Sequence, residues 1–269
     1  MLRRAAGYLA DRGCDTPRLD AELLLADALG VERLALYTDH DRPLTAGETD
    51  AYRERIARRA KREPVAYILG RRGFRRLELG VGPDVLVPRP ETELLVEWVV
   101  EAAPQGGAVL DWGTGSGAIA LAVADERPEL SVTGADRSAA ALAVARCNDP
   151  AGTVEWVVSD GFGALAERFF DVVAANPPYL TDAELAAAPP ELRFEPAGAL
   201  ASGPTGYEAL DRIAADTPAH LAPGGWLICE VGAGQADAFA ATLAAGGYTE
   251  VAVRPDLAGI GRAVGGRRA

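Results

Sequence analysis

The chain has little histidine, lysine and cysteine, and each shortage argues against a class of function. Among 269 residues there are two histidines (His40 and His220), three cysteines and one lysine (Lys61). Two histidines this far apart argue against a histidine-based metal site or a Ser-His-Asp triad. The cysteines are odd in number and widely spaced, which argues against a disulfide framework or a zinc cluster. We therefore expect a cytoplasmic protein that holds no metal.

Long apolar runs are also missing. No stretch approaches the ~20 uninterrupted apolar residues that a membrane span requires. Arg3 and Arg4 are followed by Asp11 and Arg12 and not by an apolar segment, so we expect no signal peptide. Hydrophobic residues make up 49% of the chain and charged residues 25%, which are ordinary values for a globular protein.

Positive charge is scarce except in one stretch. The net charge is −12, yet residues 53–76 contain ten basic residues and only two acidic ones, Glu54 and Glu63. A chain this acidic is a poor general binder of nucleic acid, whose phosphates must be neutralised. The basic stretch is either a docking face or a solvated helix surface, and the sequence leaves both open.

The hydrophobic pattern divides the chain into three parts. Residues 1–63 predict a small helical domain, in which Pro17 opens one helix and Thr45 with Glu48 forms a capping box for another. Residues 64–93 predict a β-hairpin, which begins with the run 67–70, and a linker. Residues 94–269 alternate between strands and helices, which indicates an α/β domain with a doubly wound, mostly parallel sheet. The predicted strands are 108–112, 131–135, 153–158, 171–175, 226–231 and 249–254.

A glycine-rich turn follows the first of these strands. It contains Gly113, Thr114, Gly115, Ser116 and Gly117, and Asp111 precedes it. Alternate glycines let a ligand approach the backbone, and the next helix offers unpaired N–H groups at its start. The spacing differs from the G-x-G-x-x-G of dinucleotide-binding proteins. Tight packing of the strand against the helix is the structural alternative.

Acidic residues end the next two strands. Asp136 lies where a carboxylate binds ribose hydroxyls in nucleotide-binding α/β folds, although it could also cap the helix that begins near Ser138. Asp160, followed by Gly161, ends the third strand and is either a ligand contact or a loop residue. Glu195 follows later and is a candidate wall of the same site.

The most informative segment is Asn176, Pro177, Pro178 and Tyr179, which follows the strand 171–175. The two prolines end the strand and stiffen the turn, because each lacks an N–H and has a fixed φ. The Asn176 oxygen and the proline carbonyls form a rigid group of acceptors suited to an –NH2 group, and Tyr179 adds a flat wall. A proline-stiffened turn without further function is the alternative interpretation.

These segments resemble the HemK/PrmC family of peptide-chain release factor N5-glutamine methyltransferases over almost the whole chain. The resemblance rests on residues 67–70, on Val-Pro-Arg-Pro-Glu-Thr-Glu at 87–93, and on the glycine turn, Asp136, residues 176–179, 194–196 and 256–259. The Pro-Arg-Pro-Glu-Thr-Glu segment is the specific one. The chain departs from the family at Trp112, usually Leu, and at Gly161, usually a bulky residue. The second change could loosen the adenine pocket unless Phe162 fills it.

The resemblance implies a class I methyltransferase fold with a seven-stranded sheet and S-adenosylmethionine as cofactor. Asp111, the glycine turn, Asp136, Asp160, Gly161 and Asn176 would bind that cofactor, and residues 176–179 would hold the substrate amide. The substrate would be the glutamine of the Gly-Gly-Gln motif in class I release factors. Because a small amide pocket cannot by itself select one protein, we expect the helical domain to dock the release factor. We expect a monomer, although no motif specifies the oligomeric state. The alternatives are a ribosomal-protein glutamine methyltransferase, a DNA adenine-N6 methyltransferase and a relative that only binds ligand.

Overall fold

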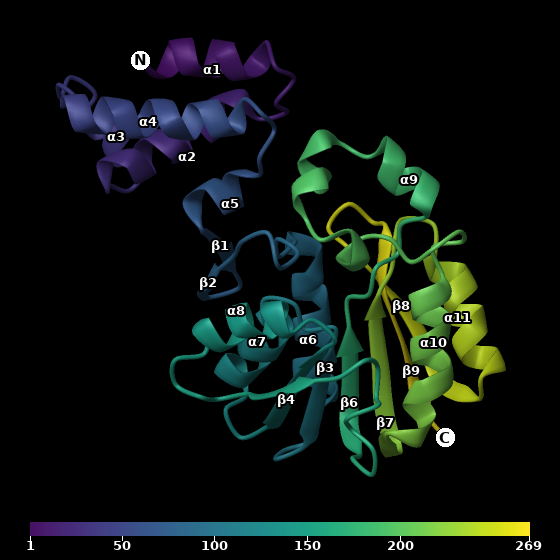
Figure 1. Ribbon diagram of the computed structural model, residues 1–269. Helices are drawn as coiled ribbons and strands as arrows, with labels where there is room; N and C mark the ends of the chain where they lie inside the picture. Colours follow the sequence, from purple (N-terminus) through teal and green to yellow (C-terminus); the bar gives the residue numbers. More distant parts are fainter. The chain divides into compact units, whose positions relative to one another are not determined.

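The computed structural model describes residues 1–269 and divides into two compact units (Figure 1). Unit 1 comprises Met1–Arg71 with Pro189–Phe194, and unit 2 comprises Arg72–Ala188 with Glu195–Ala269. None of the helices is long and apolar enough to cross a membrane.

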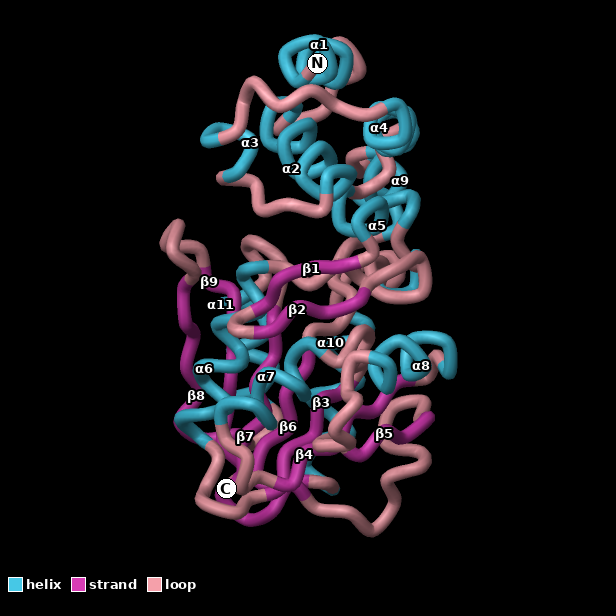
Figure 2. Tube along the Cα trace, turned by 90° about the vertical axis from the view of Figure 1, so that its left-hand side faces the viewer, coloured by secondary structure: helices cyan, strands magenta, loops and turns pink.

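Unit 1 is built from helices and loops (Figure 2). Its elements are α1 (Leu2–Ala10), α2 (Pro17–Leu29), α3 (Ala35–Thr38), α4 (Ala46–Arg59), α5 (Val65–Leu69) and the 3-10 segment Pro190–Phe194. The predicted capping box is confirmed: Glu48 N–H donates to Thr45 Oγ1 at 3.2 Å, and Thr45 N–H donates to the Glu48 carboxylate at 2.8 Å. Gly30 ends α2 with φ 63°, a conformation that glycine adopts without strain.

The predicted hairpin was right in kind and wrong in its start. Residues 65–69 form α5, and the hairpin consists of β1 (Arg71–Phe74) and β2 (Leu77–Gly80). The Pro64 carbonyl accepts from the N–H groups of Tyr67 and Ile68, which opens a helical turn. The consecutive apolar residues read as a strand from sequence, but they bury one side of a short helix, which Gly70 then ends with φ 72°.

The basic stretch 53–76 is largely neutralised within the protein. Eight of its ten basic residues form ion pairs with carboxylates: Arg53, Arg55, Arg58, Arg59, Arg62, Arg71, Arg75 and Arg76. Arg59 is only 5% exposed and pairs with Asp20 at 2.7 Å and with Glu191 at 2.9 Å. Removing one partner of a buried pair leaves an uncompensated charge. Reversing the charges of Arg58, Arg59 and Arg62 would therefore test folding of unit 1 and not docking.

Unit 2 is a seven-stranded, mostly parallel sheet, and the predicted class I methyltransferase fold is confirmed. The strands are β3 (Ala108–Trp112), β4 (Ser131–Asp136), β5 (Glu155–Val158), β6 (Phe170–Ala175), β7 (Leu221–Glu230), β8 (Tyr248–Pro255) and β9 (Gly261–Arg268). Their order in the sheet is β5-β4-β3-β6-β7-β9-β8, and β9 runs antiparallel to both neighbours. The chain turns outward in opposite directions from β3 and β6, which makes the gap between them the topological switch point.

Helices cover both faces of this sheet (Figure 1). The longer ones are α6 (Glu93–Ala102), α7 (Ala118–Glu126), α8 (Ala139–Cys147), α10 (Glu208–Asp216) and α11 (Ala236–Ala245); α9 (Asp182–Ala187) lies in the loop region after β6. One core packs α6 and α7 against the sheet, and a second packs α10 and α11 against the opposite face.

Strand β9 had no strand signal in its sequence, because it contains three glycines. At Gly265, a Cβ atom would lie 2.8 Å from the Trp98 ring and 3.1 Å from the Leu227 carbonyl oxygen. Glycine is therefore required by close packing of Trp98 on the sheet, and the pairing with β7 and β8 supplies the strand.

Candidate active site

The register of the parallel strands gathers the candidate residues at one edge of the sheet. Trp112 on β3 pairs with Ala135 on β4 and with Ala175 on β6. The residues that follow these three are Gly113, Asp136 and Asn176. They lie at the carboxyl ends of the strands beside the switch point, where α/β sheets bind their ligands.

A cavity of about 450 Å³ opens at this edge of unit 2. Of the residues predicted for the site, Gly113, Gly115, Asp136, Asp160, Gly161, Asn176, Pro177 and Pro178 line it. Asp111, Thr114, Ser116, Gly117 and Tyr179 do not. The structure therefore brings eight of the predicted residues to one cavity and separates them from those that lie behind its walls.

The three glycines of the turn have different tasks. Gly113 and Gly115 have φ of 73° and 55°, and an added Cβ at either would meet nothing within 4 Å, so their backbones are open to a ligand. At Gly117 a Cβ would lie 2.8 Å from the ring of Trp156. Gly117 thus serves the packing of α7, which is the alternative that the sequence left open for the turn.

Asp111 is placed beneath the glycine turn and not in the cavity. It is 1% exposed, and its Oδ2 accepts from Thr114 Oγ1 at 2.5 Å and from Ala120 N–H at 3.1 Å. Burial raises the pKa of this carboxyl to about 7. Asp111 therefore braces the glycine turn from below, and its predicted contact with the cofactor stays a prediction.

Asp136 lines the cavity and organises the turn. Its Oδ2 accepts from Gly115 N–H at 2.9 Å, and its Oδ1 accepts from Ser138 N–H at 2.8 Å. The expected cap of α8 is made by Ser138 itself, whose hydroxyl accepts from Ala141 N–H at 3.1 Å. Each Asp136 oxygen keeps a second lone pair, so the carboxylate can still accept from ribose hydroxyls.

The far wall of the cavity contains an arginine that the sequence did not single out. Arg212 on α10 donates to Asp160 Oδ1 at 2.8 Å, and a Cβ added at Gly161 would lie 2.6 Å from its guanidinium nitrogen. Phe162 is buried and stacks on His220 with 4.3 Å between ring centroids, so it does not fill the space beside Gly161. The Arg212 guanidinium occupies that space instead.

Asn176 extends into the cavity on a stiff turn. Pro177 and Pro178 follow it and also line the cavity. The Asn176 Nδ2 donates to Thr92 Oγ1 at 2.9 Å, which holds that end of the side chain. The other end, Oδ1, remains to accept from a ligand, and an acceptor at this place suits an –NH2 group.

Tyr179 supports the turn from outside the cavity. Its carbonyl accepts from Gln235 Nε2 at 3.2 Å, and its ring lies 3.1 Å from where a Cβ at Gly232 would be. Burial raises the pKa of Tyr179 further above its ordinary value. Any contact of this ring with a substrate would therefore be made beyond the cavity that the other three residues line.

Glu195 also supports the site without lining it. Its side chain is buried, and its carboxylate accepts from Arg89 Nη2 at 2.5 Å and from Val87 N–H at 3.0 Å. The Pro-Arg-Pro-Glu segment is thereby fixed to the loop after β6, and the neighbouring Pro196 forms part of the cavity wall. No local sequence signal could pair residues more than a hundred positions apart.

The cavity fits S-adenosylmethionine on its own features. Two open glycine backbones provide a place for close approach, and Asp136 offers acceptors for hydroxyl groups. The residues that would hold the cofactor are Gly113, Gly115, Asp136 and the Asp160–Arg212 wall. Among all residues, no group of three or more His, Cys, Asp or Glu side chains is arranged to hold a metal ion.

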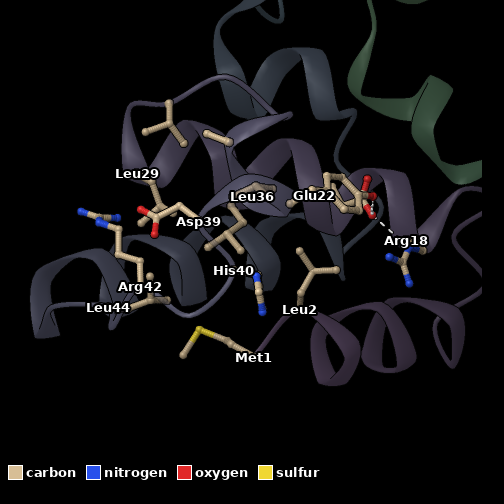
Figure 3. A pocket seen from close by; sticks show the side chains of 14 residues that line it. Met1, Leu2, Arg18, Glu22, Leu29, Leu36, Asp39, His40, Arg42 and Leu44 are labelled. Carbon is tan, nitrogen blue, oxygen red and sulfur yellow. Dashed lines mark hydrogen bonds and ion pairs between the residues drawn. The ribbon is translucent and has the colours of Figure 1, made fainter.

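Unit 1 has a cavity of its own, of about 360 Å³ (Figure 3). Leucines form much of its lining: Leu2, Leu25, Leu29, Leu36 and Leu44. Glu22 lies at one end, where its carboxylate accepts from Arg18 at 2.9 Å and from Tyr37 Oη at 2.5 Å. Most of the lining side chains are apolar and the Glu22 carboxylate is already paired, which suits binding.

Two family models match the chain. The PrmC N-terminal domain model matches residues 1–70, and the methyltransferase small domain model matches residues 90–192. Among solved structures, a methyltransferase from Pyrococcus furiosus superposes with a TM-score of 0.54 at 18% identity, covering 72% of this chain and 89% of that one. That likeness agrees with the fold of unit 2.

Curated relatives match nearly the full length. The release factor glutamine methyltransferase of Geobacter sulfurreducens is 42% identical over 264 residues, 97% of this chain and 93% of the relative. That of Burkholderia pseudomallei is 47% identical over 260 residues, 93% of this chain and 91% of the relative. Identity at this level over both units confirms the resemblance seen in the motifs. The chain belongs to the family of release factor glutamine methyltransferases.

Proposed function

We propose that this protein transfers a methyl group from S-adenosylmethionine to the side-chain amide nitrogen of a glutamine in class I peptide-chain release factors, within their Gly-Gly-Gln motif. The observation that carries the proposal is the meeting, in one cavity, of an amide-accepting turn and a cofactor cradle. Asn176, Pro177 and Pro178 form the first, and Gly113, Gly115 and Asp136 the second. The relatives named above act on release factors by name.

The chemical task of the chain is to position a weak nucleophile. An amide nitrogen attacks poorly because its lone pair is delocalised, so orientation and electrostatic stabilisation must carry the rate. When bound, S-adenosylmethionine supplies an electrophilic methyl group on a positively charged sulfur. Asn176 Oδ1 and the Pro177 carbonyl would accept from the two amide N–H groups and aim the nitrogen. The same two oxygens would stabilise positive charge as the methyl group leaves sulfur and bonds to nitrogen, and the methylated amide would then pass one proton to solvent water.

The test is incubation of the purified protein with isotopically labelled S-adenosylmethionine and purified release factors, followed by mass spectrometry. We expect one methyl group on the glutamine of Gly-Gly-Gln. A release factor with that glutamine replaced by alanine is the control and should take up no label. Label that appears instead on a ribosomal protein or on DNA adenine would overturn the proposal.

We propose that nucleic acid is not the substrate, that the protein works in the cytoplasm and that it is a monomer. The internal pairing of eight basic residues in the stretch 53–76 supports the first point, since few free cations remain there to meet phosphates. Three free cysteines support a reducing compartment. Sedimentation of the purified protein tests the oligomeric state.

We propose further that the helical unit docks the body of the release factor. A small amide pocket cannot distinguish one protein's glutamine from another's, and unit 1 offers a cavity lined mostly by apolar side chains. Exposed apolar side chains lie on the same unit: Leu34 is 71% exposed and Tyr37 52%. Apolar anchors of this kind are typical of binding surfaces.

Leu34→Asp should raise the KM for whole release factor several-fold, because it replaces an apolar anchor of the docking surface by a charge. The kcat should be unchanged, because Leu34 is exposed and the variant should fold normally. Phe169→Asp is the matched control, since Phe169 is 58% exposed and precedes β6 at the opposite end of the strand from Asn176. Activity on a short Gly-Gly-Gln peptide should be equal in both variants. Equal KM values for the two variants on whole release factor would remove Leu34 from the docking surface.

A further inference from the structure

Two hydrogen bonds in series link Asn176 to a buried carboxylate that has no assigned role. Asn176 Nδ2 donates to Thr92 Oγ1 at 2.9 Å, and Thr92 Oγ1 donates to Glu230 Oε2 at 2.6 Å. Thr92 is 4% exposed and Glu230 is 2% exposed. Burying a carboxyl group is costly unless it is hydrogen-bonded, so the hydrogen bonds that Glu230 makes are informative.

The fold brings these three residues together from distant parts of the sequence. Strands β6 and β7 are parallel, and Ala175 pairs with Cys229. Asn176 and Glu230 are therefore the next residues on two neighbouring strand ends. Thr92 ends the 3-10 turn Pro90–Thr92 and is held there by its own N–H, which donates to the Arg89 carbonyl at 3.2 Å.

Glu230 sets the direction of both hydrogen bonds in this series. An ionised carboxylate only accepts hydrogen bonds, and a threonine hydroxyl has a single proton to give. Once Thr92 spends that proton on Glu230, it can offer Asn176 only a lone pair. The Asn176 amide must then turn its NH2 group toward Thr92, which leaves Oδ1 for the cavity.

We propose that Glu230 is a positioning residue: through Thr92, it fixes which end of the Asn176 side-chain amide faces the substrate. The inference rests on the proposed function, since a substrate –NH2 group needs an acceptor opposite it. With the Asn176 amide reversed, two NH2 groups would face each other and the substrate nitrogen would lose its anchor. The specificity for an amide nitrogen thus originates in a carboxylate that never touches it.

The protonation of Glu230 should affect this order. Burial, with a smaller contribution from Glu91, raises the pKa of Glu230 to about 7 against the hydrogen bond from Thr92 and the charges of Arg262 and Arg89, which lower it. The nearby Tyr179 phenol stays neutral, since burial raises its pKa as well. Protonated Glu230 can itself donate to Thr92, which frees the hydroxyl proton for Asn176. Orientation should therefore weaken as the pH falls through about 7.

The first experiment needs no release factor. The chain has only two asparagines, Asn148 and Asn176, so selective ¹⁵N-asparagine labelling gives two side-chain NH2 signals. The Asn176 signal should shift with pH around a midpoint near 7 in the wild type and not in Glu230→Gln. Asn148 is the internal control, because its Nδ2 donates to the Gly80 and Ser116 carbonyls. An Asn176 signal that is insensitive to pH and to Glu230→Gln would overturn the proposal even if the protein methylates release factors as proposed.

The second experiment separates positioning from folding by a matched pair at Thr92. Thr92→Val keeps the shape and removes the hydroxyl, so we expect at least a tenfold loss of kcat with little change in the Kd of S-adenosylmethionine. Thr92→Ser keeps the hydroxyl and should recover most of kcat. Equal kcat values in the two variants, with both folded, would show that the hydroxyl does not position Asn176. An inactive wild type would instead contradict the proposed function and leave the labelling result to decide on Glu230.

Glu230→Gln should lower kcat and remove its dependence on pH near 7, whereas wild-type kcat should rise as the pH is raised through that value. The free energy of unfolding should change with pH in the opposite direction to kcat. The folded-state pKa of Glu230 lies above its ordinary value of 4.5, so the stability that this group contributes below 4.5 is lost as the pH rises to about 7. At pH 8 the glutamine variant should therefore melt no lower than the wild type. A lower melting temperature together with an unchanged pH profile would mark Glu230 as a packing residue only.

Discussion

Replacing Asn176 by alanine should lower kcat by roughly 10²–10³-fold while the Kd of S-adenosylmethionine stays within a few-fold. The factor is that of removing one preorganised hydrogen-bonding group from a site where charge develops. Asn176 lines the cavity, but its free oxygen is placed for an –NH2 group, whereas the cofactor cradle is formed by Gly113, Gly115 and Asp136. Calorimetry with the cofactor and steady-state kinetics with release factor measure the two quantities separately.

Asn176→Asp is the companion variant, because it keeps the size of the side chain and replaces the Nδ2 donor by an oxygen. Thr92 would then lie between two acceptors, the new carboxylate at position 176 and that of Glu230, with a single proton to donate. We therefore expect this variant also to have a lower kcat than the wild type. Thermal unfolding confirms that each protein is folded. A fall in cofactor affinity as large as the fall in kcat would show that Asn176 belongs to the cofactor site and not to the substrate site.

The location of the site could be predicted from sequence because it depends on local patterns. Strand ends are visible where an apolar run meets glycine or proline, and parallel strands place those ends at one edge. Gly113, Asp136 and Asn176 each follow or end such a run, and the registers of β3, β4 and β6 bring them together. The same patterns predicted six of the seven strands of the main sheet.

What the sequence could not show is which side chains point into the cavity. Asp111 is buried beneath the turn, whereas its neighbour Trp112 lines the cavity, since successive side chains of a strand alternate between faces. Tyr179 and Glu195 do not line the cavity: the Tyr179 backbone carbonyl accepts from Gln235, and the Glu195 carboxylate accepts from Arg89. The partners of these bonds are 56 and 106 positions distant.

The hydrogen bonds that join Asn176, Thr92 and Glu230 cannot be predicted from sequence for the same reason. Thr92 and Glu230 are 138 positions apart and meet only because the 3-10 turn before α6 is folded against the end of β7. Thr92 was visible as one letter of a family motif, and Glu230 as the end of an apolar strand. Neither pattern indicates which group donates and which accepts, because the direction of these hydrogen bonds depends on all three side chains together.

Replacing Asp136 by alanine should weaken S-adenosylmethionine binding by at least tenfold and leave kcat at saturating cofactor less affected. Two hydroxyl hydrogen bonds to a carboxylate would be lost, and hydrogen bonds to charged groups contribute ~1.5–3 kcal/mol each. The variant would also release Gly115, whose N–H donates to Asp136 Oδ2 at 2.9 Å, and so loosen the turn that Gly113 and Gly115 open to the ligand.

Asp136→Asn separates these two contributions, because its amide oxygen can keep the bond from Gly115 N–H while the charge and one acceptor are lost. We expect its Kd to lie between those of the wild type and Asp136→Ala. Glu129→Ala, which removes a carboxylate beside Arg127 on the loop between α7 and β4, is the surface control and should bind the cofactor like the wild type. Calorimetry on the three variants gives the order directly. An unchanged Kd in Asp136→Ala would reduce Asp136 to a brace between the glycine turn and the start of α8, and the ribose contact would then have to be sought at Asp160 or Arg212.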